Sequence, residues 1–532
     1  MKGPISIIKF LLPGMLILSM IASGCAAATA TPAATNTMVP PTSAPVSSPT
    51  ATVAPTADEL VIAIPEDISN YAPYQGQGDM HTPAIFKMLY DNLIERDTQG
   101  NLVPGLATSW SWLDDKTLEL KLRSGVKFHN GQDFSAADVL YSINLLESIP
   151  QGAAFKSIDT VEVVDPLTVK IHTNKVDSQL VFNMTQFLGI LPGATITAEG
   201  ADAYALKPIG TGPYMFVEHE RDQYIKLTAN PNYWDGSYKG KPIVKNLTFR
   251  FIPELATRLA ELEAGTVDIA VGVTNDKVDE IKATQGLHIE TGDGTAYYMM
   301  PFAFKKGVDA PYNDIQVREA LAYGTDVKSI MDALAGGYGT LLAGPFTSIT
   351  TGYDPSLQPW PYDKAKALQL LAAAGYPNGF TLTIDVASSV PTDVVMAVAG
   401  EWKDIGVTLN IIPMEVGKFN DLWLSHKNDD MVAVGINSET EPASFVYIWT
   451  CAGAISYYCN DAFETPYNQG VALLDDTQRA AAFRKAFQVL HDDVPAIYLW
   501  SSDVHWGVSN KVTTFAYTPD GSLIPSLINK VK

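Results

Sequence analysis

The chain has 532 residues and a formal net charge of −22, and 46% of its residues are hydrophobic while 18% are charged. This length exceeds the ~250 to 300 residues at which a single hydrophobic core stops growing, so we expect two or three domains. Nucleic acids and anionic lipid surfaces select for basic patches, so the acidic balance argues against both as partners and is compatible with a cationic or neutral solute.

The first 25 residues have the pattern of an export signal. Lys2 and Lys9 form a short basic start, and the apolar stretch 10–21 is too short to span a bilayer as a mature helix. The segment Ala22-Ser23-Gly24-Cys25 resembles the lipobox of bacterial lipoproteins, in which the cysteine is diacylated and becomes the new N-terminus. This resemblance implies an extracytoplasmic protein, periplasmic or on the outer surface, anchored to the cell membrane through Cys25. Plain secretion with a spare thiol is the alternative.

Residues 26–57 form a tether in this interpretation. They contain no charged side chain and are dominated by Ala, Thr, Pro, Ser and Val, a composition that cannot build a core. The prolines favour an extended chain, which would hold a folded body away from a membrane and leave it free to rotate.

The folded part begins at Glu59. Residues 60–64 predict a short buried strand that ends at Pro65, and a polar, aromatic loop follows over residues 66–81. Open α/β sheets usually place a ligand at the carboxyl ends of their strands, so this loop supplies candidate ligand-binding residues, with a solvated loop as the alternative. The candidates are Tyr71, Tyr74, Gln75, Gln77, Asp79 and Met80.

A strand, a turn and a capped helix follow one another between Thr117 and Ile143. Leu118, Leu120 and Leu122 alternate with charged residues, which is the period of a half-buried strand. Asn130-Gly131 marks a tight turn, and Ser135 is placed to cap a helix. His129 lies in the turn, and we interpret it as a turn residue and not as a ligand or catalyst.

This stretch resembles the signature of the extracellular solute-binding proteins of family 5, through Leu122-Arg123-Ser124-Gly125-Val126-Lys127-Phe128-His129-Asn130-Gly131 and Ser135-Ala136-Ala137-Asp138-Val139. The resemblance continues, in the family's order, over almost all of the chain from Glu59 onward. The other matching segments are 89–93, 103–110, 210–214, 230–234, 262–270, 314–322 and 362–380.

The family resemblance implies a receptor for an ABC importer, with a two-lobed α/β fold of the periplasmic-binding-protein type. It implies the large cluster C form, which has three domains and a ligand cleft between its lobes. The expected division is 58–88, 208–296 and 496–532 for domain I of lobe 1, 89–207 for domain II of lobe 1, and 297–495 for domain III, which is lobe 2. We expect one hinge crossing at Gly294–Tyr297 and the other near Pro495, with Ile497–Trp500 returning to lobe 1.

Local signals in the second lobe predict several helices. Asp314, Thr325 or Asp326, and Asp363 each precede an apolar helical pattern and are placed to cap it. Alternation at 382–386 predicts a strand, and residues 479–490 predict a late amphipathic helix.

The charged clamp of peptide-binding relatives is altered in this chain. In those relatives, a Gly-Trp-x-x-Asp segment holds the peptide's ammonium group; here Gly435 replaces the Trp and Ser438 stands where the Asp is expected. A shift by one residue would put Glu439 there, so Glu439 either takes over the charge or is an exposed loop carboxylate. Dipeptide-specific relatives also carry an Arg after the strand at 382–386, whereas this chain reads Ala387-Ser388-Ser389-Val390-Pro391. We therefore expect a solute that is not a free dipeptide held by both charged ends.

The remaining candidate site is aromatic and rich in amides and hydroxyls. Flat apolar faces with neutral hydrogen-bond partners suit sugar rings or an elongated neutral ligand, although about half of such aromatics are expected to be core residues. The candidates in the second lobe are Tyr297, Tyr298, Ser389, Asn437, Ser438, Glu439, Trp449, Tyr457 and Tyr458.

Cysteine and histidine spacing argues against a metal site. Cys451 and Cys459 lie close together in an exported chain and predict a disulfide, and two thiols without a histidine cluster make a poor zinc site. The eight histidines show no His-x-His or i, i+4 pair, which disfavours nickel, and only His81 lies near the expected cleft. We expect no cofactor and no bound metal.

The sequence favours a binding protein over an enzyme. It contains no Gly-x-Ser-x-Gly and no His-Glu-x-x-His, and a secreted glycoside hydrolase using Glu439 and Glu441 is the weaker alternative. No Walker pattern occurs, so the energy for import would come from a separate ATPase. The expected partners of this monomer are a small solute (a peptide, an oligosaccharide or similar), an ABC permease with its ATPase subunits, and the membrane through lipidated Cys25, but no nucleic acid.

Overall fold

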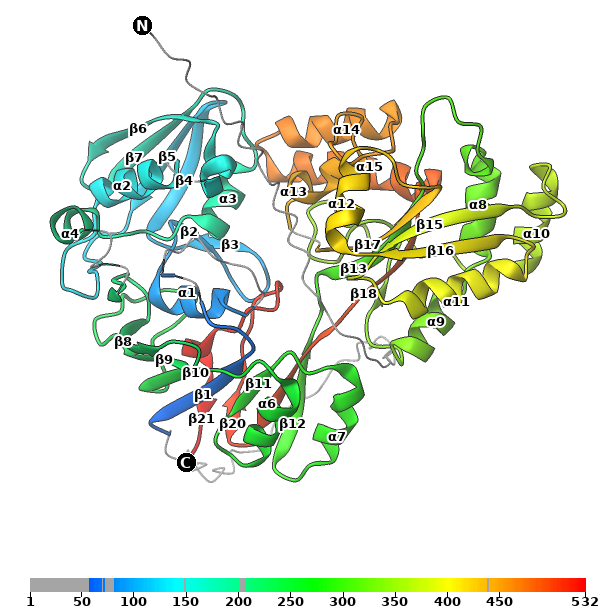
Figure 1. The fold of residues 1–532 in the computed structure, drawn as a ribbon. Helices are drawn as coiled ribbons and strands as arrows, with labels where there is room; N and C mark the ends of the chain where they lie inside the picture. Colours follow the sequence, from blue (N-terminus) through cyan, green and yellow to red (C-terminus); the bar gives the residue numbers. More distant parts are fainter. Residues whose placement is uncertain are drawn as a thin grey trace, which may run out of the picture.

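The computed structural model of the protein describes residues 57–68, 70–71, 81–147, 150–200, 204, 206–437 and 440–532. These residues form two lobes of mixed α/β structure, which lie side by side in Figure 1 and are joined by two chain crossings near the centre. Within these ranges, no helix is both long and apolar enough to cross a membrane. The two-lobed α/β prediction is confirmed.

The main sheet of lobe 1 has seven strands in the order β12-β19-β11-β1-β10-β9-β8. Its central strand β1 (Glu59–Ile64) runs parallel to β10 (Asn246–Phe251) and to β11 (Ile269–Val271), and the outer strands pair antiparallel. Leu60, Ile62 and Ile64 are buried, as the apolar run predicts, because they pack against helix α1 (Pro83–Leu89). The other elements are β8 (Tyr214–Glu220), β9 (Tyr224–Ala229), α6 (Leu255–Glu263), η2 (Asn275–Lys277), α7 (Val278–Ala283), β12 (Leu287–Gly292) and β19 (Val504–Ser509).

A second sheet of lobe 1 has four antiparallel strands in the order β4-β5-β7-β6. In β5 (Thr117–Leu122) the three leucines face the core, so the predicted alternation is confirmed. Helix α2 (Ala136–Glu147) begins directly after Ser135, as predicted, but the capping side chain is that of Asp138. Its carboxylate accepts the backbone N–H of Ser135 at 3.0 Å and the Ser135 hydroxyl at 3.2 Å. The other elements are β2 (Ile94–Arg96), β3 (Leu102–Pro104), β4 (Ala107–Asp114), η1 (Pro150–Phe155), β6 (Ile158–Asp165), β7 (Thr168–Thr173), α3 (Leu180–Phe187) and α4 (Gly193–Glu199).

Lobe 2 is built on a six-stranded sheet in the order β14-β18-β13-β17-β15-β16. One face packs on α8 (Ile315–Tyr323), α9 (Val327–Leu334), α10 (Lys364–Ala373) and α11 (Thr392–Lys403). The other face packs on α12 (Val416–Leu424), α13 (Pro442–Phe445), α14 (Asp461–Ala472) and α15 (Asp476–Asp493). The strands are β13 (Ala296–Pro301), β14 (Thr340–Leu341), β15 (Thr381–Ala387), β16 (Thr408–Met414), β17 (Met431–Asn437) and β18 (Ala496–Ser501), and the short helices are η3 (Pro311–Asn313) and η4 (Val446–Trp449).

Three of the predicted helix caps are present in lobe 2. The carboxylates of Asp314, Asp326 and Asp363 accept hydrogen bonds from backbone N–H groups in the first turns of α8, α9 and α10, at 2.9, 3.0 and 2.9 Å. These short polar side chains satisfy N–H groups that have no partner inside the helix. The predicted late amphipathic helix is α15.

The second crossing between the lobes lies later in the chain than the sequence predicts. Strand β18 contains Ile497–Trp500 but pairs with β13 and β14, so it belongs to the sheet of lobe 2. The chain returns to lobe 1 only at residues 502–503, before β19. The prediction of a return near Pro495 was wrong, because an apolar run shows that a strand is buried but not which sheet buries it. The C-terminal segment in lobe 1 adds β20 (Val512–Thr514), η5 (Pro525–Leu527) and β21 (Asn529–Lys530).

A buried cluster of charges ties the segment after α1 and strand β2 to the loops that flank β8 and β9. The Asp91 carboxylate has no exposure to solvent and accepts hydrogen bonds from Lys239 at 2.8 Å, Tyr233 and Trp234 at 2.9 Å, and Thr211 at 3.0 Å. Lys239 also pairs with Glu95 at 2.8 Å. Burial by itself raises the pKa of Asp91, but the Lys239 ammonium and the hydrogen bonds hold that pKa below its usual value.

His129 supports the same cluster as a turn residue, as the sequence predicts. Its Nε2 lies 3.0 Å from the carbonyl oxygen of Gly212, and its Nδ1 accepts the backbone N–H of Gly210 at 3.2 Å. Burial lowers the pKa of His129 to about 4, so the ring is neutral. A Cβ atom at Gly210 would lie 1.9 Å from the carbonyl oxygen of Leu89, so only glycine fits this close approach.

We predict that Lys239→Met destabilises the protein by about 3 to 5 kcal/mol, because it leaves two buried carboxylates without their shared cation. The control is Lys241→Met, two residues away, whose Asp235 ion pair is exposed and is expected to contribute less than about 1 kcal/mol. Urea unfolding at pH 7 measures both changes, and similar midpoints for the two variants would contradict the prediction.

Candidate binding site between the lobes

The carboxyl ends of the parallel strands in lobe 2 meet at the edge that faces the crossings. Strands β15, β16 and β17 run parallel, and the last residue of β17, Asn437, pairs with Ala296 at the start of β13. The loop 388–391 therefore begins at this edge of the sheet, as does the segment that follows Asn437. Loops at this position are the usual place for a ligand in open α/β sheets.

The two crossings lie directly against each other. The backbone N–H of Ser502 donates to the carbonyl oxygen of Ala296 at 2.9 Å, and a Cβ atom at Gly294 would lie 1.6 Å from the carbonyl oxygen of Ser502. The glycine predicted to mark the hinge is thus required by the close approach of the second crossing. Two adjoining extended segments form a narrow hinge, about which the lobes can rotate by small changes in a few backbone angles.

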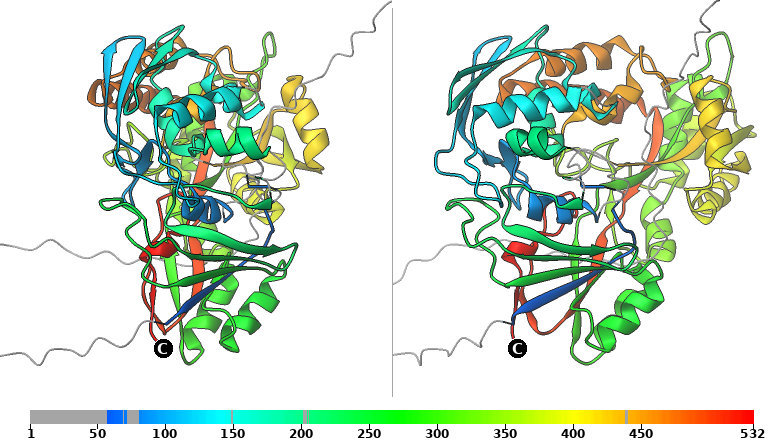
Figure 2. Two further views of the ribbon diagram at one scale, coloured as in Figure 1. Left: turned by 90° about the vertical axis from the view of Figure 1, so that its left-hand side faces the viewer. Right: turned by 60° about the vertical axis from the view of Figure 1, so that its left-hand side comes forward.

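The lobes also touch away from the crossings. The hydroxyl of Ser178, before α3, donates to the carbonyl oxygen of Val471 in α14 at 2.6 Å, and Arg479 of α15 donates to the carbonyl oxygen of Ser178 at 3.2 Å. Figure 1 and Figure 2 show α14 and α15 beside the four-stranded sheet and helices of lobe 1. Arg479 also pairs with Glu441, and burial raises the pKa of Glu441 to about 7.

A pocket of about 70 Å³ lies between the lobes. Lobe 2 contributes Ile349 and Thr440, the first crossing contributes Thr295, and lobe 1 contributes the rest of the wall. The lining groups of lobe 1 are Lys87, Glu95, Arg96, Gly100, Thr185, Gln186, Tyr238, Thr518, Pro519 and Asp520. A pocket lined by both lobes changes its shape when the lobes move, so its occupant is coupled to that movement.

Three predicted ligand residues keep a buried polar atom for which the described residues provide no hydrogen-bond partner. These atoms are the Tyr71 hydroxyl, the Ser389 hydroxyl and the Trp449 indole nitrogen. Tyr71 packs in lobe 1, with its ring 5.3 Å from Phe216, whereas Ser389 follows β15 in lobe 2. The structure does not bring the three together, so their role in binding stays a prediction.

Other predicted aromatics are core residues of lobe 2. Tyr297 is fully buried and donates its hydroxyl to the carbonyl oxygen of Pro345 at 3.4 Å. Trp449 and Tyr458 pack in the same hydrophobic cluster, with ring centroids 6.1 Å apart, and Tyr457 binds Asn428. Asn437 is partly exposed at the end of β17.

The predicted residues that lie outside the described part of the chain are Cys25, Tyr74, Gln75, Gln77, Asp79, Met80, Ser438 and Glu439.

Gly435 is the direct cross-strand partner of Tyr298, and a Cβ atom at Gly435 would lie 3.4 Å from the Tyr298 ring, an ordinary van der Waals contact. The Tyr298 ring therefore lies beside the position at which the family resemblance expects a Trp, but the space there does not by itself require glycine.

The sequence did not identify the charged residues of the pocket between the lobes. Lys87, Arg96 and Asp520 come from a helix, a three-residue strand and a C-terminal turn that are far apart in the chain. Each is an isolated polar residue without a local motif, so only the tertiary structure brings them together.

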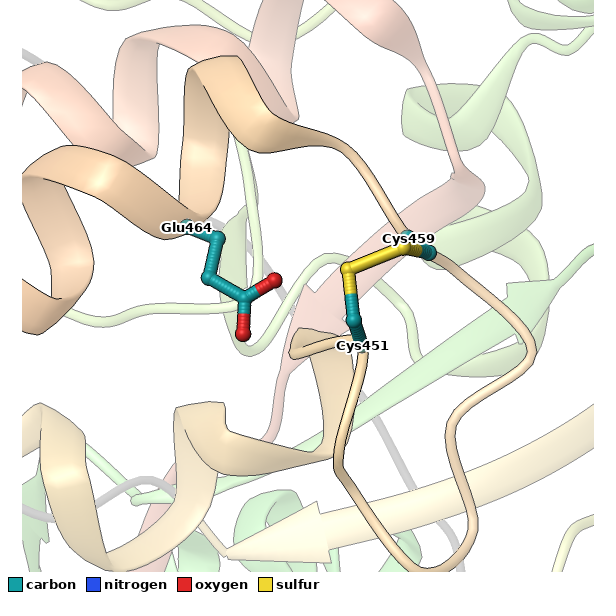
Figure 3. Close-up of side chains that lie close together, drawn as sticks. All are labelled: Cys451, Cys459 and Glu464. Atoms are coloured by element: carbon teal, nitrogen blue, oxygen red, sulfur yellow. A yellow bond between two sulfur atoms is a disulfide. The ribbon is translucent and has the colours of Figure 1, made fainter.

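The predicted disulfide between Cys451 and Cys459 is present (Figure 3). Glu464 lies beside it, and one ligand atom from each of the three residues falls within 4.8 Å of the others. The two sulfur atoms are bonded to each other and so do not offer thiolates to a metal ion. By the loop-entropy model, a loop of this length contributes about 2.5 kcal/mol, which holds the surface loop before α14 in place.

A family model of bacterial extracellular solute-binding proteins, family 5 (middle region), matches residues 101–457. Heme-binding protein A of Haemophilus influenzae is 28% identical over 481 residues, covering 82% of this chain and 86% of the relative. Glutathione-binding protein GsiB of Pectobacterium atrosepticum is 26% identical, covering 87% of this chain and 92% of the relative.

Solved structures show the same fold. HbpA2 from Haemophilus parasuis is 25% identical, with a TM-score of 0.79 over 89% of this chain and 100% of that one. MppA, a periplasmic murein tripeptide binding protein in its unliganded open form, is 22% identical, with a TM-score of 0.80 over 91% of this chain and 99% of that one.

We predict that Gly294→Ala destabilises the protein by about 1 to 3 kcal/mol, because its methyl group forces the two crossings apart. Gly400→Ala is the control: this helical glycine in α11 has open space around it, and the change is expected to stabilise the protein by about 0.5 to 1 kcal/mol. Thermal unfolding measures both variants, and a Gly294→Ala protein as stable as the wild type would disprove the packed hinge.

Proposed function

The chain belongs to the bacterial extracellular solute-binding proteins of family 5 and is a solute-binding receptor of an ABC transporter; we propose that it captures a peptide-like solute by closing its two lobes. The closed form then docks on a membrane permease, and a separate ATPase supplies the energy for import. The observation that carries this proposal is the position of the pocket between the lobes, beside the two packed crossings. At about 70 Å³ this pocket has room for one group of such a solute and not for the whole molecule.

Lobe closure follows from where the pocket lies. A solute that touches Thr440 in lobe 2 and the lobe 1 wall at the same time makes its full set of contacts only at one lobe arrangement. Because such a solute binds that arrangement better than any other, it shifts the population toward it. The crossings at 293–295 and 502–503 supply the hinge.

Two features of the chain guide the choice of solute class. Its relatives in the family include proteins named for heme and glutathione, and others named for dipeptides and tripeptides. The loop after β15 contains no Arg, so the solute is not a dipeptide held at both ends in the manner of the dipeptide-specific relatives. We favour a larger peptide-like solute, with an oligosaccharide as the alternative that a screen of both classes distinguishes.

The proposed cellular location rests on the sequence of residues 1–57. The export pattern of the first 25 residues, the lipobox-like segment ending at Cys25 and the uncharged tether 26–57 support an extracytoplasmic protein anchored to the cell membrane by lipid. The family is extracellular, which agrees with export but does not bear on the lipid.

A hydrolase that uses Glu439 and Glu441 is not favoured. The Glu441 carboxylate is buried against Arg479 and packed between the lobes, which leaves it no access to a glycosidic bond. The family consists of solute receptors, and the proposed role is binding without chemical change.

A thermal-shift screen tests the solute class. The wild-type protein is heated with dipeptides, tripeptides, glutathione, hemin and oligosaccharides in turn. A solute at one hundred times its dissociation constant adds about 2.7 kcal/mol to the unfolding free energy, which raises the midpoint by about 1 to 4 °C.

We expect the largest shift from tripeptides, glutathione or hemin, and a smaller one from dipeptides because the two-ended clamp is absent. A dipeptide shift as large as any other would mean that the clamp has been rebuilt from other residues. If native mass spectrometry also detects no complex with any of these solutes, the proposal of a peptide-like solute fails.

A further inference from the structure

The charged side chains that line the pocket between the lobes are paired, with one exception. Lys87 pairs with Asp520 at 3.4 Å, and Glu95 pairs with Lys239 at 2.8 Å. Arg96 lies within 4 Å of no acidic group among the residues that the structure describes. A guanidinium group stays protonated in proteins, so Arg96 brings to the pocket a positive charge that no described carboxylate contacts.

The Arg96 side chain is held in place by neutral groups. Its Nε donates to the Thr185 hydroxyl at 3.3 Å, its Nη1 donates to the carbonyl oxygen of Gly100 at 3.2 Å, and its Cζ lies 4.8 Å from the centre of the Phe182 ring. Thr185 is itself oriented, because its hydroxyl donates to the carbonyl oxygen of Phe182 at 2.8 Å. These contacts leave Nη2 without a partner among the described residues, so the guanidinium fork is already positioned for an acceptor.

The surroundings of Arg96 favour an anion beside Nη2 of its guanidinium group. Partly buried charges in proteins are normally paired, and burial already lowers the pKa of Arg96 to about 10. The fork geometry of arginine matches two oxygens of one carboxylate. The pocket also offers Thr440 from lobe 2, whose hydroxyl is of a type that binds carboxylate oxygens.

One acidic side chain of lobe 2, that of Glu441, is the alternative to a solute as the anion that pairs with Arg96. Glu441 is close enough to Arg96 to affect its pKa and has one carboxylate oxygen without a hydrogen-bond partner among the described residues. Its other oxygen is bound by Arg479, however, and no ion pair joins it to Arg96 in the described structure. The Glu441 carboxylate therefore acts on Arg96 through its charge and does not occupy the guanidinium fork.

We propose that Arg96 anchors a subsite for a carboxylate group between the two lobes, so that the captured solute is an acid. This inference deepens the proposed function and rests on it. It also accounts for the missing Arg after β15: the cation that binds the solute's carboxylate is supplied by lobe 1 instead of lobe 2. The carboxylate can come from the solute or from a free organic anion, and the experiment separates the two sources.

The first arm of the test needs no knowledge of the solute. Sodium acetate replaces sodium chloride at constant ionic strength, and the unfolding midpoint is recorded for wild type, Arg96→Gln, Arg96→Lys and Arg484→Gln. Arg484 is a half-exposed arginine on α15 and serves as the matched control. We expect acetate to raise the midpoint of wild type and Arg484→Gln by about 1 °C, to raise that of Arg96→Lys less, and to leave that of Arg96→Gln unchanged.

The second arm uses matched solutes with free and masked carboxylates. Trialanine is compared with trialanine amide, glutathione with its diethyl ester, and hemin with its dimethyl ester, by titration calorimetry. Charge-assisted hydrogen bonds of this kind change affinity by roughly 10- to 100-fold. We expect a loss of this size on masking and a similar loss for the acid in Arg96→Gln, with no further loss when both changes are combined.

The two arms decide different points. An acetate effect that persists in Arg96→Gln overturns the subsite, whether or not any solute binds. An acetate effect that depends on Arg96, together with equal affinities for acids and esters, overturns the acidic solute and assigns the subsite to a free anion. If no solute in either form binds, the proposed peptide-like solute fails while the acetate arm still decides the subsite.

A last variant tests the competing partner. If Arg96 and Glu441 pair with each other in solution, acetate should leave the midpoint of wild type unchanged and raise it only in Glu441→Gln, where Arg96 has lost its partner. In the proposed subsite, acetate already raises the midpoint of wild type, and Glu441→Gln strengthens this effect at pH 8 because a neighbouring negative charge is removed. An acetate effect that is absent in wild type and appears only in Glu441→Gln overturns the proposal.

Discussion

The buried carboxylate of Asp91 is the constraint on which the architecture of lobe 1 depends. A charge without solvent contact requires a cation and several hydrogen bonds, and Asp91 obtains them from Lys239, Thr211, Tyr233 and Trp234. Thr211, Tyr233 and Trp234 lie in the segments 210–214 and 230–234, which resemble family motifs, whereas Lys239 lies outside them. The sequence alone does not connect these positions. Together they fix one carboxylate and, through it, hold the segment after α1 against the loops that flank β8 and β9.

This charge cluster also positions the wall of the pocket. Glu95 shares Lys239 with Asp91 and lies at the start of the β2–β3 hairpin, so the next residue, Arg96, projects from a backbone that is tied to the lobe's core. On the other side, Thr440 follows a strand of lobe 2 whose end is paired to the first crossing. The pocket therefore lies between two lobes that are joined by a narrow hinge, an arrangement in which a small solute can bias a large movement.

Local patterns in the sequence were sufficient for most elements of the fold. The alternation at Leu118, Leu120 and Leu122 and the caps at Asp314 and Asp363 concern residues within one turn or one strand of each other, and the structure confirms them. The strand at Ile497–Trp500 was placed in the wrong lobe because its partners β13 and β14 are distant in the chain. Arg96 was missed for the same reason, since its importance lies in its place in the pocket, where none of the described carboxylates pairs with it. The predicted roles of Ser438 and Glu439 remain predictions.

The central claim is that a solute bound between the lobes changes their arrangement, and small-angle X-ray scattering tests it most directly. Scattering is recorded from the protein alone and at saturation with the solute that stabilises it most against heat. We expect a smaller radius of gyration and a smaller maximum dimension for the complex, because the lobes rotate toward each other about the crossings at 293–295 and 502–503. Superimposable scattering curves from the free and saturated protein would contradict lobe closure.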